Sequence, residues 1–121
     1  MCRLSSNSKR IAHEFIDKAI RQAQANNILV IAPGGNDKGE CWCVPAVLEN
    51  VLTVGAMKDT GEPFKFSNFG GKYASQGILA PGENILGAQP GTDDPIRKKG
   101  TSCAAPIRPP AKVLFSYLMI A

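Results

Sequence analysis

A serine surrounded by small residues is the first feature of this 121-residue sequence that could do chemistry. Ser102 lies in the run Gly-Thr-Ser-Cys-Ala-Ala-Pro, residues 100–106. The glycine and the alanines leave room for a substrate carbonyl, and the start of a helix favours developing negative charge, so Ser102 fits the role of a nucleophile. Ser102 or Thr101 fits the cap of a helix equally well. The residues alone leave both interpretations open.

A glycine-rich loop is the second candidate site. Residues 33–39 read Pro-Gly-Gly-Asn-Asp-Lys-Gly and follow a continuous apolar run. In α/β folds, sites gather at the carboxyl ends of parallel strands, so the loop is well placed. Gly34 and Gly39 have the separation of a phosphate-binding loop, but Glu40 and Cys41 follow where lysine and serine or threonine are needed. A nucleotide site is therefore disfavoured.

The elements that must position these two loops alternate between helix and strand. Apolar residues recur at helical spacing over residues 9–26, and Asn26-Asn27 is suited to end that helix. The run 28–32 predicts a strand buried on both faces. Further strands are predicted at 51–57 and 77–80, with a hairpin formed by 85–88 and residues around Ile96. The order predicts one α/β unit with a mainly parallel sheet.

Composition narrows the function classes. Hydrophobic residues make up 44% and charged residues 20% of the chain, which is typical of a folded globular protein. No apolar run approaches the ~20 residues that span a bilayer, so no membrane partner is expected. The net charge of +4 is scattered apart from Arg97-Lys98-Lys99, which disfavours a nucleic-acid partner. With no apolar stretch like that of a signal peptide near its start, the chain is expected to be cytoplasmic.

Metal binding is not expected either. The four cysteines are Cys2, Cys41, Cys43 and Cys103, and His13 is the one histidine. A structural zinc site needs two well-spaced pairs of ligands, which these residues do not form. Reduced thiols are the expectation.

Five motifs, in order along the chain, resemble those of the subtilisin-like serine proteases (subtilases, peptidase S8). They are Ala32-Pro-Gly-Gly-Asn36-Asp; Val44-Pro-Ala46 with Val51-Leu-Thr-Val-Gly-Ala-Met57; Phe66-Ser-Asn-Phe-Gly70; Leu79-Ala-Pro-Gly82; and the run 100–106. The sequences of these motifs are most similar to those of the proteases of cyanobactin maturation, which process ribosomally made precursor peptides by cleavage or macrocyclisation. The resemblance implies part of the three-layer subtilisin fold and a serine-type endopeptidase that acts on peptides.

The resemblance also assigns roles to residues. It implies that Ser102 is the nucleophile and that Asn36 donates to the oxyanion beside the backbone amide of Ser102. It places Pro33, Gly34 and Gly35 in one wall of the substrate pocket, Cys43 and Pro45 near its base, and Thr101 beside the substrate. A cis peptide bond before Pro45 is expected, and Cys103 is interpreted as packing. No cofactor is required for this chemistry, and a structural calcium ion is left open.

Two departures from the family pattern stand out. The catalytic aspartate and histidine motifs do not occur in the 35 residues before Asn36, and His13 lies in the wrong place. Residues 1–107 are therefore interpreted as the C-terminal part of a subtilase catalytic domain, truncated on its N-terminal side. Pro109-Pro110 stops the helix that should follow Ser102, so residues 108–121 are interpreted as a divergent apolar tail, with a frameshift as the hypothesis.

Three hypotheses of function follow. In the first, the chain belongs to a serine endopeptidase whose aspartate and histidine come from an upstream segment or another chain. In the second, it is an inactive remnant or a peptide-binding module. The third and weakest is a nucleotide-binding α/β module. On its own the chain is expected to be nearly inactive, and poorly soluble because half a sheet leaves an open edge.

Overall fold

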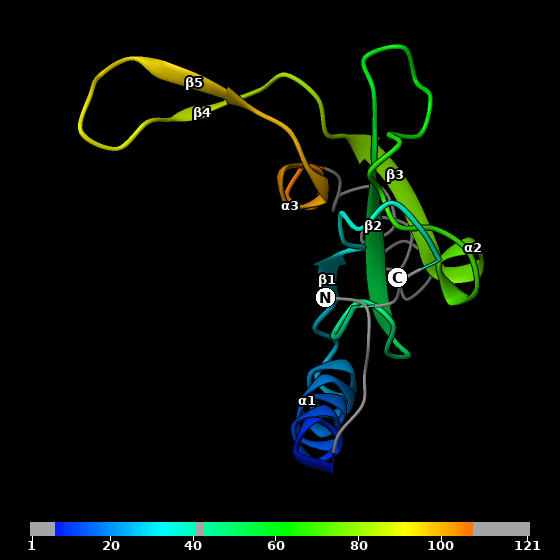
Figure 1. Ribbon diagram of the computed structural model, residues 1–121. Coiled ribbons are helices and arrows are strands. Elements are labelled where there is room, and N and C mark those ends of the chain that lie inside the picture. The colour runs from blue at the N-terminus through cyan, green and yellow to red at the C-terminus, as the bar shows by residue number, and fades with distance from the viewer. Residues whose placement is uncertain (1–6, 41–42, 108–121) are drawn as a thin grey trace, which may run out of the picture.

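The computed structural model describes residues 7–40 and 43–107, arranged around a small parallel sheet (Figure 1). The sheet has the order β1-β2-β3, and both pairings are parallel. A separate antiparallel hairpin joins β4 to β5. The elements are α1 (Asn7–Ala25), β1 (Val30–Pro33), β2 (Val51–Met57), α2 (Lys72–Gln76), β3 (Gly77–Pro81), β4 (Ile85–Ala88), β5 (Pro95–Lys98) and α3 (Thr101–Ala104). The predicted α/β fold with a mainly parallel sheet is confirmed, whereas α2 was not predicted.

β2 is the central strand, and its alternating side chains separate the core into two clusters. Val51 packs with Ala32, Leu48 and Tyr73 in one cluster. Val54, on the other face of the pleat, packs in a second cluster with Ala56, Ala80 and Ala104. Because Ala104 belongs to α3, the second cluster fixes the segment that carries Ser102 against β2 and β3.

The first strand is shorter than predicted. β1 begins at Val30 because its pairing with β2 begins there, where Val30 lies opposite Val51, the first residue of β2. Ile28 and Leu29 therefore precede the sheet and are exposed, Ile28 by 59%. The prediction of a strand over 28–32, buried on both faces, was wrong at its start.

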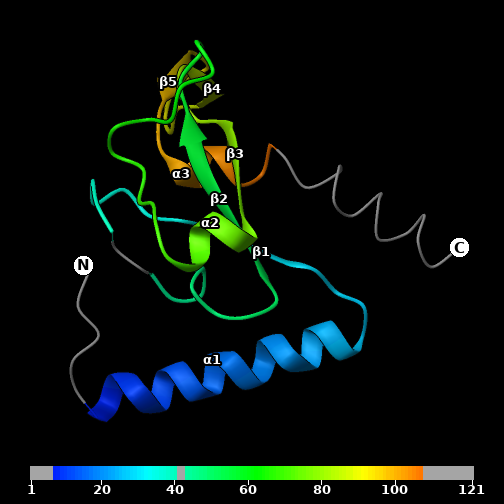
Figure 2. The same cartoon turned by 90° about the vertical axis from the view of Figure 1, so that its right-hand side faces the viewer.

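The first helix has the predicted place but not the predicted burial. α1 ends as expected, with Asn27 in a left-handed conformation and the amide of Ile28 donating to the carbonyl of Ala23. Ile20 is buried, but Phe15 on the same apolar stripe is 75% exposed. Both views place α1 at the opposite end of the sheet from α3 (Figures 1 and 2).

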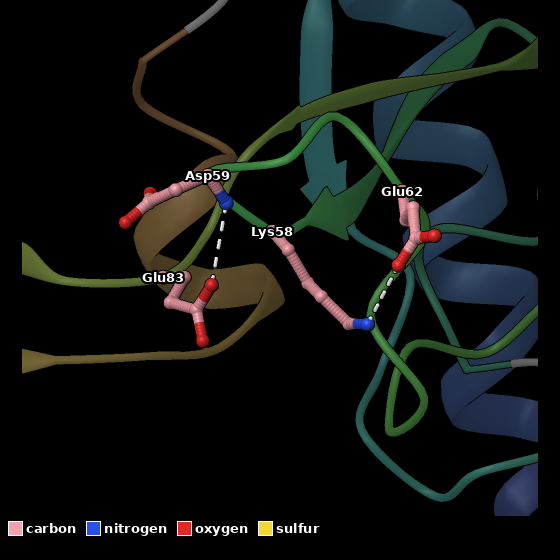
Figure 3. Close-up of polar contacts among 4 residues, drawn as sticks. All are labelled: Lys58, Asp59, Glu62 and Glu83. Carbon is pink, nitrogen blue, oxygen red and sulfur yellow. Dashed lines mark hydrogen bonds and ion pairs between the residues drawn. The ribbon is translucent and has the colours of Figure 1, made fainter.

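Polar contacts tie the turn after β2 to the segment between β3 and β4 (Figure 3). The amide of Asp59 donates to the Glu83 carboxylate at 3.2 Å, and Lys58 forms an ion pair with Glu62 at 2.8 Å. The Lys58–Glu62 pair lies within the turn, whereas the Asp59–Glu83 contact joins the turn to the base of the β4–β5 hairpin, which projects from the sheet in Figure 1.

Gly82, which follows β3, connects the end of β2 to the start of α3 through backbone hydrogen bonds. Its amide donates to the carbonyl of Met57, and its carbonyl accepts from the amide of Gly100. A Cβ atom at position 82 would lie 2.6 Å from the Cβ of Ala56, so only glycine allows this approach. The segment 82–100 thus leaves the sheet and returns to it beside Ser102. The predicted tail, 108–121, lies outside the described residues.

Candidate active site

The loop after β1 and the start of α3 are joined through Asn36 and Thr101. The amide and the hydroxyl of Thr101 both donate to Oδ1 of Asn36, at 3.0 and 3.1 Å. The amide of Gly35 donates to the Thr101 hydroxyl at 3.2 Å. The carboxamide oxygen of Asn36 is thus held on the side of Thr101. Its Nδ2 group makes no hydrogen bond within the described part of the chain and can donate to a ligand.

Two donor nitrogens lie near the same point beside Gly100. A Cβ atom built on Gly100 would lie 3.6 Å from Asn36 Nδ2, 3.8 Å from Oδ1 of the same side chain and 4.0 Å from the backbone nitrogen of Ser102. An anion-stabilising pocket needs such convergence of preorganised donors. Ser102 itself is exposed at the surface. The arrangement therefore places an accessible hydroxyl beside two convergent N–H groups.

The capping interpretation of the serine motif is wrong. The N-cap of α3 is Gly100, and no side chain forms a capping hydrogen bond. Thr101 directs its hydroxyl to the loop after β1 instead. Cys103 is half-buried, less buried than the packing role predicts.

The predicted pocket residues flank this pair of loops. Pro33 ends β1 opposite Val54, whose carbonyl accepts from the amide of Gly34. Gly35 adjoins Cys43, since a Cβ atom on Gly35 would lie 2.9 Å from the sulfur of Cys43.

The base of this region is a turn that Cys43 opens. Its amide donates to the hydroxyl of Tyr73 at 2.9 Å, and its carbonyl accepts from Val47. The peptide bond between Val44 and Pro45 is cis, as expected. The structure thus brings residues 33–36, Cys43 and Thr101 together, with Pro45 two residues further along the turn.

The sequence did not predict two residues that lie at the site, Tyr73 and Asn68. Tyr73 was outside every predicted element, and Asn68 was noted only as part of a family-like motif. Asn68 is buried and contacts Gly34, Asp37 and Cys43 through its side chain. The signal that could have indicated it was an amide in a loop between apolar residues, since a buried amide needs partners.

A hydrogen bond from Asn68 and burial set the protonation of the Asp37 carboxyl and the Cys43 thiol, respectively. A hydrogen bond from Asn68 lowers the pKa of Asp37, so its carboxylate is ionised at neutral pH. Burial raises the pKa of the Cys43 thiol, and the Asp37 carboxylate, 3.8 Å from the sulfur, raises it further. The Cys43 thiol is therefore neutral at neutral pH.

The Cys43 thiol is expected to react with iodoacetamide more slowly in the folded chain than in the urea-unfolded chain, between about pH 7 and 9. A raised pKa leaves less thiolate at each pH, so the folded rate rises only at higher pH. Mass spectrometry of the peptide that contains Cys43 gives both rates. Equal rates at about pH 8 would contradict the assignment.

Gly35→Ala is expected to lower the free energy of unfolding by about 3 kcal/mol. Gly35 has a φ of +103°, and an added Cβ atom would collide with Nδ2 of Asn68 and crowd the Cys43 sulfur. Gly61→Ala is the matched control, because Gly61 has a φ of +86° but open space around it. It should cost only the ~1–2 kcal/mol of the left-handed backbone. Equal losses in urea denaturation would show that the collision is absent.

His13 lies away from this site. It lines a separate cavity with Asp17 and Arg21 of α1 and with Leu48. α1 and α3 lie at opposite ends of the sheet in both views (Figures 1 and 2). Within residues 7–40 and 43–107 no three His, Cys, Asp or Glu side chains gather as metal ligands. None of the described helices is long and apolar enough to cross a membrane.

Comparison with known proteins gives a consistent family. A sequence model of the subtilase family matches residues 3–107. Subtilisin BL of Lederbergia lenta is 32% identical over 91 residues, which are 75% of this chain and 32% of that protein. The resemblance to subtilases is confirmed.

Solved structures agree. The PatG macrocyclase in complex with peptide has a TM-score of 0.77 at 50% identity, covering 88% of this chain and 32% of that chain. The prenylagaramide maturation protease PagA has a TM-score of 0.74 at 50% identity, covering 85% of this chain and 35% of that chain. The resemblance to maturation proteases of this kind is also confirmed. The chain spans about a third of the length of these relatives.

Proposed function

Because the chain belongs to the subtilase family of serine proteases, we propose that it is the part of a serine endopeptidase that carries the nucleophile, Ser102. The observation that carries this proposal is the convergence of Asn36 Nδ2 and the Ser102 amide in front of Gly100, beside an exposed serine. Residues 1–107 would form this part of the catalytic domain, and residues 108–121 a divergent tail outside it.

In the proposed reaction, the oxygen of Ser102 attacks the carbonyl carbon of the scissile peptide bond and gives its proton to a base. The carbonyl oxygen becomes an oxyanion, which accepts hydrogen bonds from Asn36 Nδ2 and the Ser102 amide. Collapse of the tetrahedral intermediate expels the protonated amine and leaves an acyl-enzyme, which water hydrolyses. Every step uses protein groups and water, without a cofactor.

The base and its partner acid are proposed to come from outside this sequence. His13, the one histidine in the chain, lines a cavity at α1 and not at Ser102. An upstream segment or a second chain that supplies histidine and aspartate would complete the triad. Without it, the one histidine of the sequence does not lie where it could take the Ser102 proton.

The proposed substrate is a peptide, and among peptides a ribosomally made precursor. The PatG structure holds a peptide, and the other solved relative is named for prenylagaramide maturation. Pro33, Gly34 and Gly35 would form the wall of the pocket for the residue before the scissile bond, with Cys43 and Pro45 near its base and Thr101 beside the substrate.

A fluorophosphonate probe tests the nucleophile. The Ser102 oxygen bonds to phosphorus, fluoride leaves, and the proton goes to the base, so labelling requires activation. We expect background labelling of the chain alone, and labelling of Ser102 once a second polypeptide with the subtilase aspartate and histidine motifs is added. Ser102→Ala is the control for site selectivity. A mixture that stays unlabelled, while a complete subtilase is labelled, would refute the proposed activity.

The second candidate is a peptide-binding module. It is favoured because His13 lies away from Ser102, whereas the loop 33–35 and the two donors, Asn36 Nδ2 and the Ser102 amide, lie beside it. Fluorescence anisotropy of a labelled peptide with the chain alone tests it. Binding that Ser102→Ala leaves intact, without labelling in any mixture, would favour this candidate over the protease.

A further inference from the structure

Asn68 directs most of its hydrogen bonds at the loop that carries Asn36. Its Oδ1 accepts from the amide of Asp37 at 2.8 Å. Its Nδ2 donates to the carbonyl of Gly34 at 3.1 Å and to the carboxylate of Asp37 at 3.2 Å. Its backbone amide donates to the carbonyl of Gly35 at 3.0 Å. The residue is 5% exposed, so these contacts exclude water.

The contacts fall on both sides of Asn36. Gly34 and Gly35 precede it and Asp37 follows it, so Asn68 grips the loop on either side without touching the Asn36 side chain. Asn36 itself is exposed. From the side of α3, Thr101 fixes Oδ1 of Asn36. The direction of Nδ2 therefore depends on two anchors, one on the side chain and one on the backbone.

The same residue shapes the neighbouring wall. A Cβ atom on Gly35 would collide with Nδ2 of Asn68, so the Asn68 side chain approaches the Gly35 backbone as closely as glycine allows. Nδ2 also lies 3.8 Å from the Cys43 sulfur. A shift of Asn68 would move the loop and the base of the pocket together.

We infer that Asn68 is a positioning residue, which sets Asn36 Nδ2 at the distance from Ser102 that oxyanion binding requires. The inference rests on the proposed function, because it concerns the same oxyanion pocket. It differs from a general stabilising role, since the four contacts converge on three residues around one donor. A misplacement of about 1 Å at such a donor can cost about 100-fold in rate.

The neighbouring serine provides a matched control. Ser67 is 6% exposed, and its hydroxyl accepts from the amide of Ala56 in β2 at 3.2 Å. Ser67→Ala therefore removes that bond and the long one, 3.5 Å, from its hydroxyl to the backbone carbonyl of Asn68, but no side-chain contact of Asn68 with the loop 34–37. Comparing it with Asn68→Ala separates loss of stability from loss of position.

The experiment has two readouts on the 121-residue chain. The first is nuclear magnetic resonance of the Asn36 side-chain amide, together with hydrogen exchange of the Asp37 backbone amide. The second is the rate of fluorophosphonate labelling of Ser102 in the mixture with the second polypeptide. Asn68→Ala should shift the Asn36 signals, speed Asp37 exchange about tenfold or more, and slow labelling about 10- to 100-fold. Ser67→Ala should leave all three near the wild-type values.

Asn68→Asp replaces the alanine variant if the latter does not fold. It keeps the acceptor for the Asp37 amide, removes the donor to the Gly34 carbonyl and adds a second carboxylate beside Asp37. The Asn36 signals should still shift and labelling should still slow.

Unshifted Asn36 signals in the folded Asn68 variant would overturn the inference. Equal shifts in Ser67→Ala would overturn it too, because the effect would then be one of stability alone. If wild-type chain is never labelled, the proposed function fails. The Asn36 and Asp37 signals then decide by themselves whether Asn68 positions the loop.

Discussion

Replacing Ser102 by alanine is expected to lower the turnover of the complemented protease about 10⁶-fold, a figure that comes from subtilisin itself rather than from this chain. Without the hydroxyl there is no nucleophile to form the acyl-enzyme. Residual hydrolysis would depend on substrate binding and the two oxyanion donors. Release of a chromophore from a peptide substrate measures turnover, with the second polypeptide in excess.

Cys103→Ala is the control for this loss. Cys103 is the adjacent residue and is half-buried, so its thiol is the alternative nucleophile to exclude. Turnover of Cys103→Ala should stay within a few-fold of wild type. Residual turnover of Ser102→Ala that disappears on removing Cys103 would assign the chemistry to the wrong residue.

The second large effect is expected from Asn36→Leu, which should lower turnover about 10²–10³-fold, again a magnitude known from subtilisin. Leucine has the same branched arrangement of heavy atoms as asparagine but no N–H to donate, so one of the two oxyanion donors is lost. Because the oxyanion exists only after attack, kcat should fall while KM changes little. Steady-state kinetics on the same substrate separates the two constants.

Asn36 has a second role that this substitution also removes, since its Oδ1 accepts from Thr101. Asn36→Asp keeps that acceptor, lacks the donor and adds a negative charge near the oxyanion. It should therefore lose at least as much turnover as Asn36→Leu. Asn26→Leu, at an exposed position just after α1, should leave turnover unchanged. Full activity of Asn36→Asp would refute oxyanion donation by Nδ2.

Local patterns in the sequence determined much of the fold. The strand predicted over 51–57 matches β2, because its β-branched and small residues suit a strand buried on both faces. The hairpin of β4 and β5 follows from turn residues between two short apolar runs. The motifs determined the family, because their order along the chain can be read from the sequence without knowing how the segments pack.

Only the tertiary structure decided burial and the contacts between distant segments. Phe15 belongs to an amphipathic helix, yet it is exposed because no described element covers that part of α1. Ile28 and Leu29 fall outside the sheet because β2 offers no residue for them to pair with.

The site shows the same division. Types and motif order identified Ser102 and Asn36 as candidates, since each stands in a recognisable local run. Asn68 was recognised as part of a motif only, because its partners lie about 30 residues away in the sequence. The periodicity of a segment indicates which face of the element a side chain takes, but not which loop packs against that face. The contacts of Asn68 and Thr101 with the loop of Asn36 depend on the packing of the segment 64–71 and of α3 against β2. No local pattern in the sequence encodes that packing.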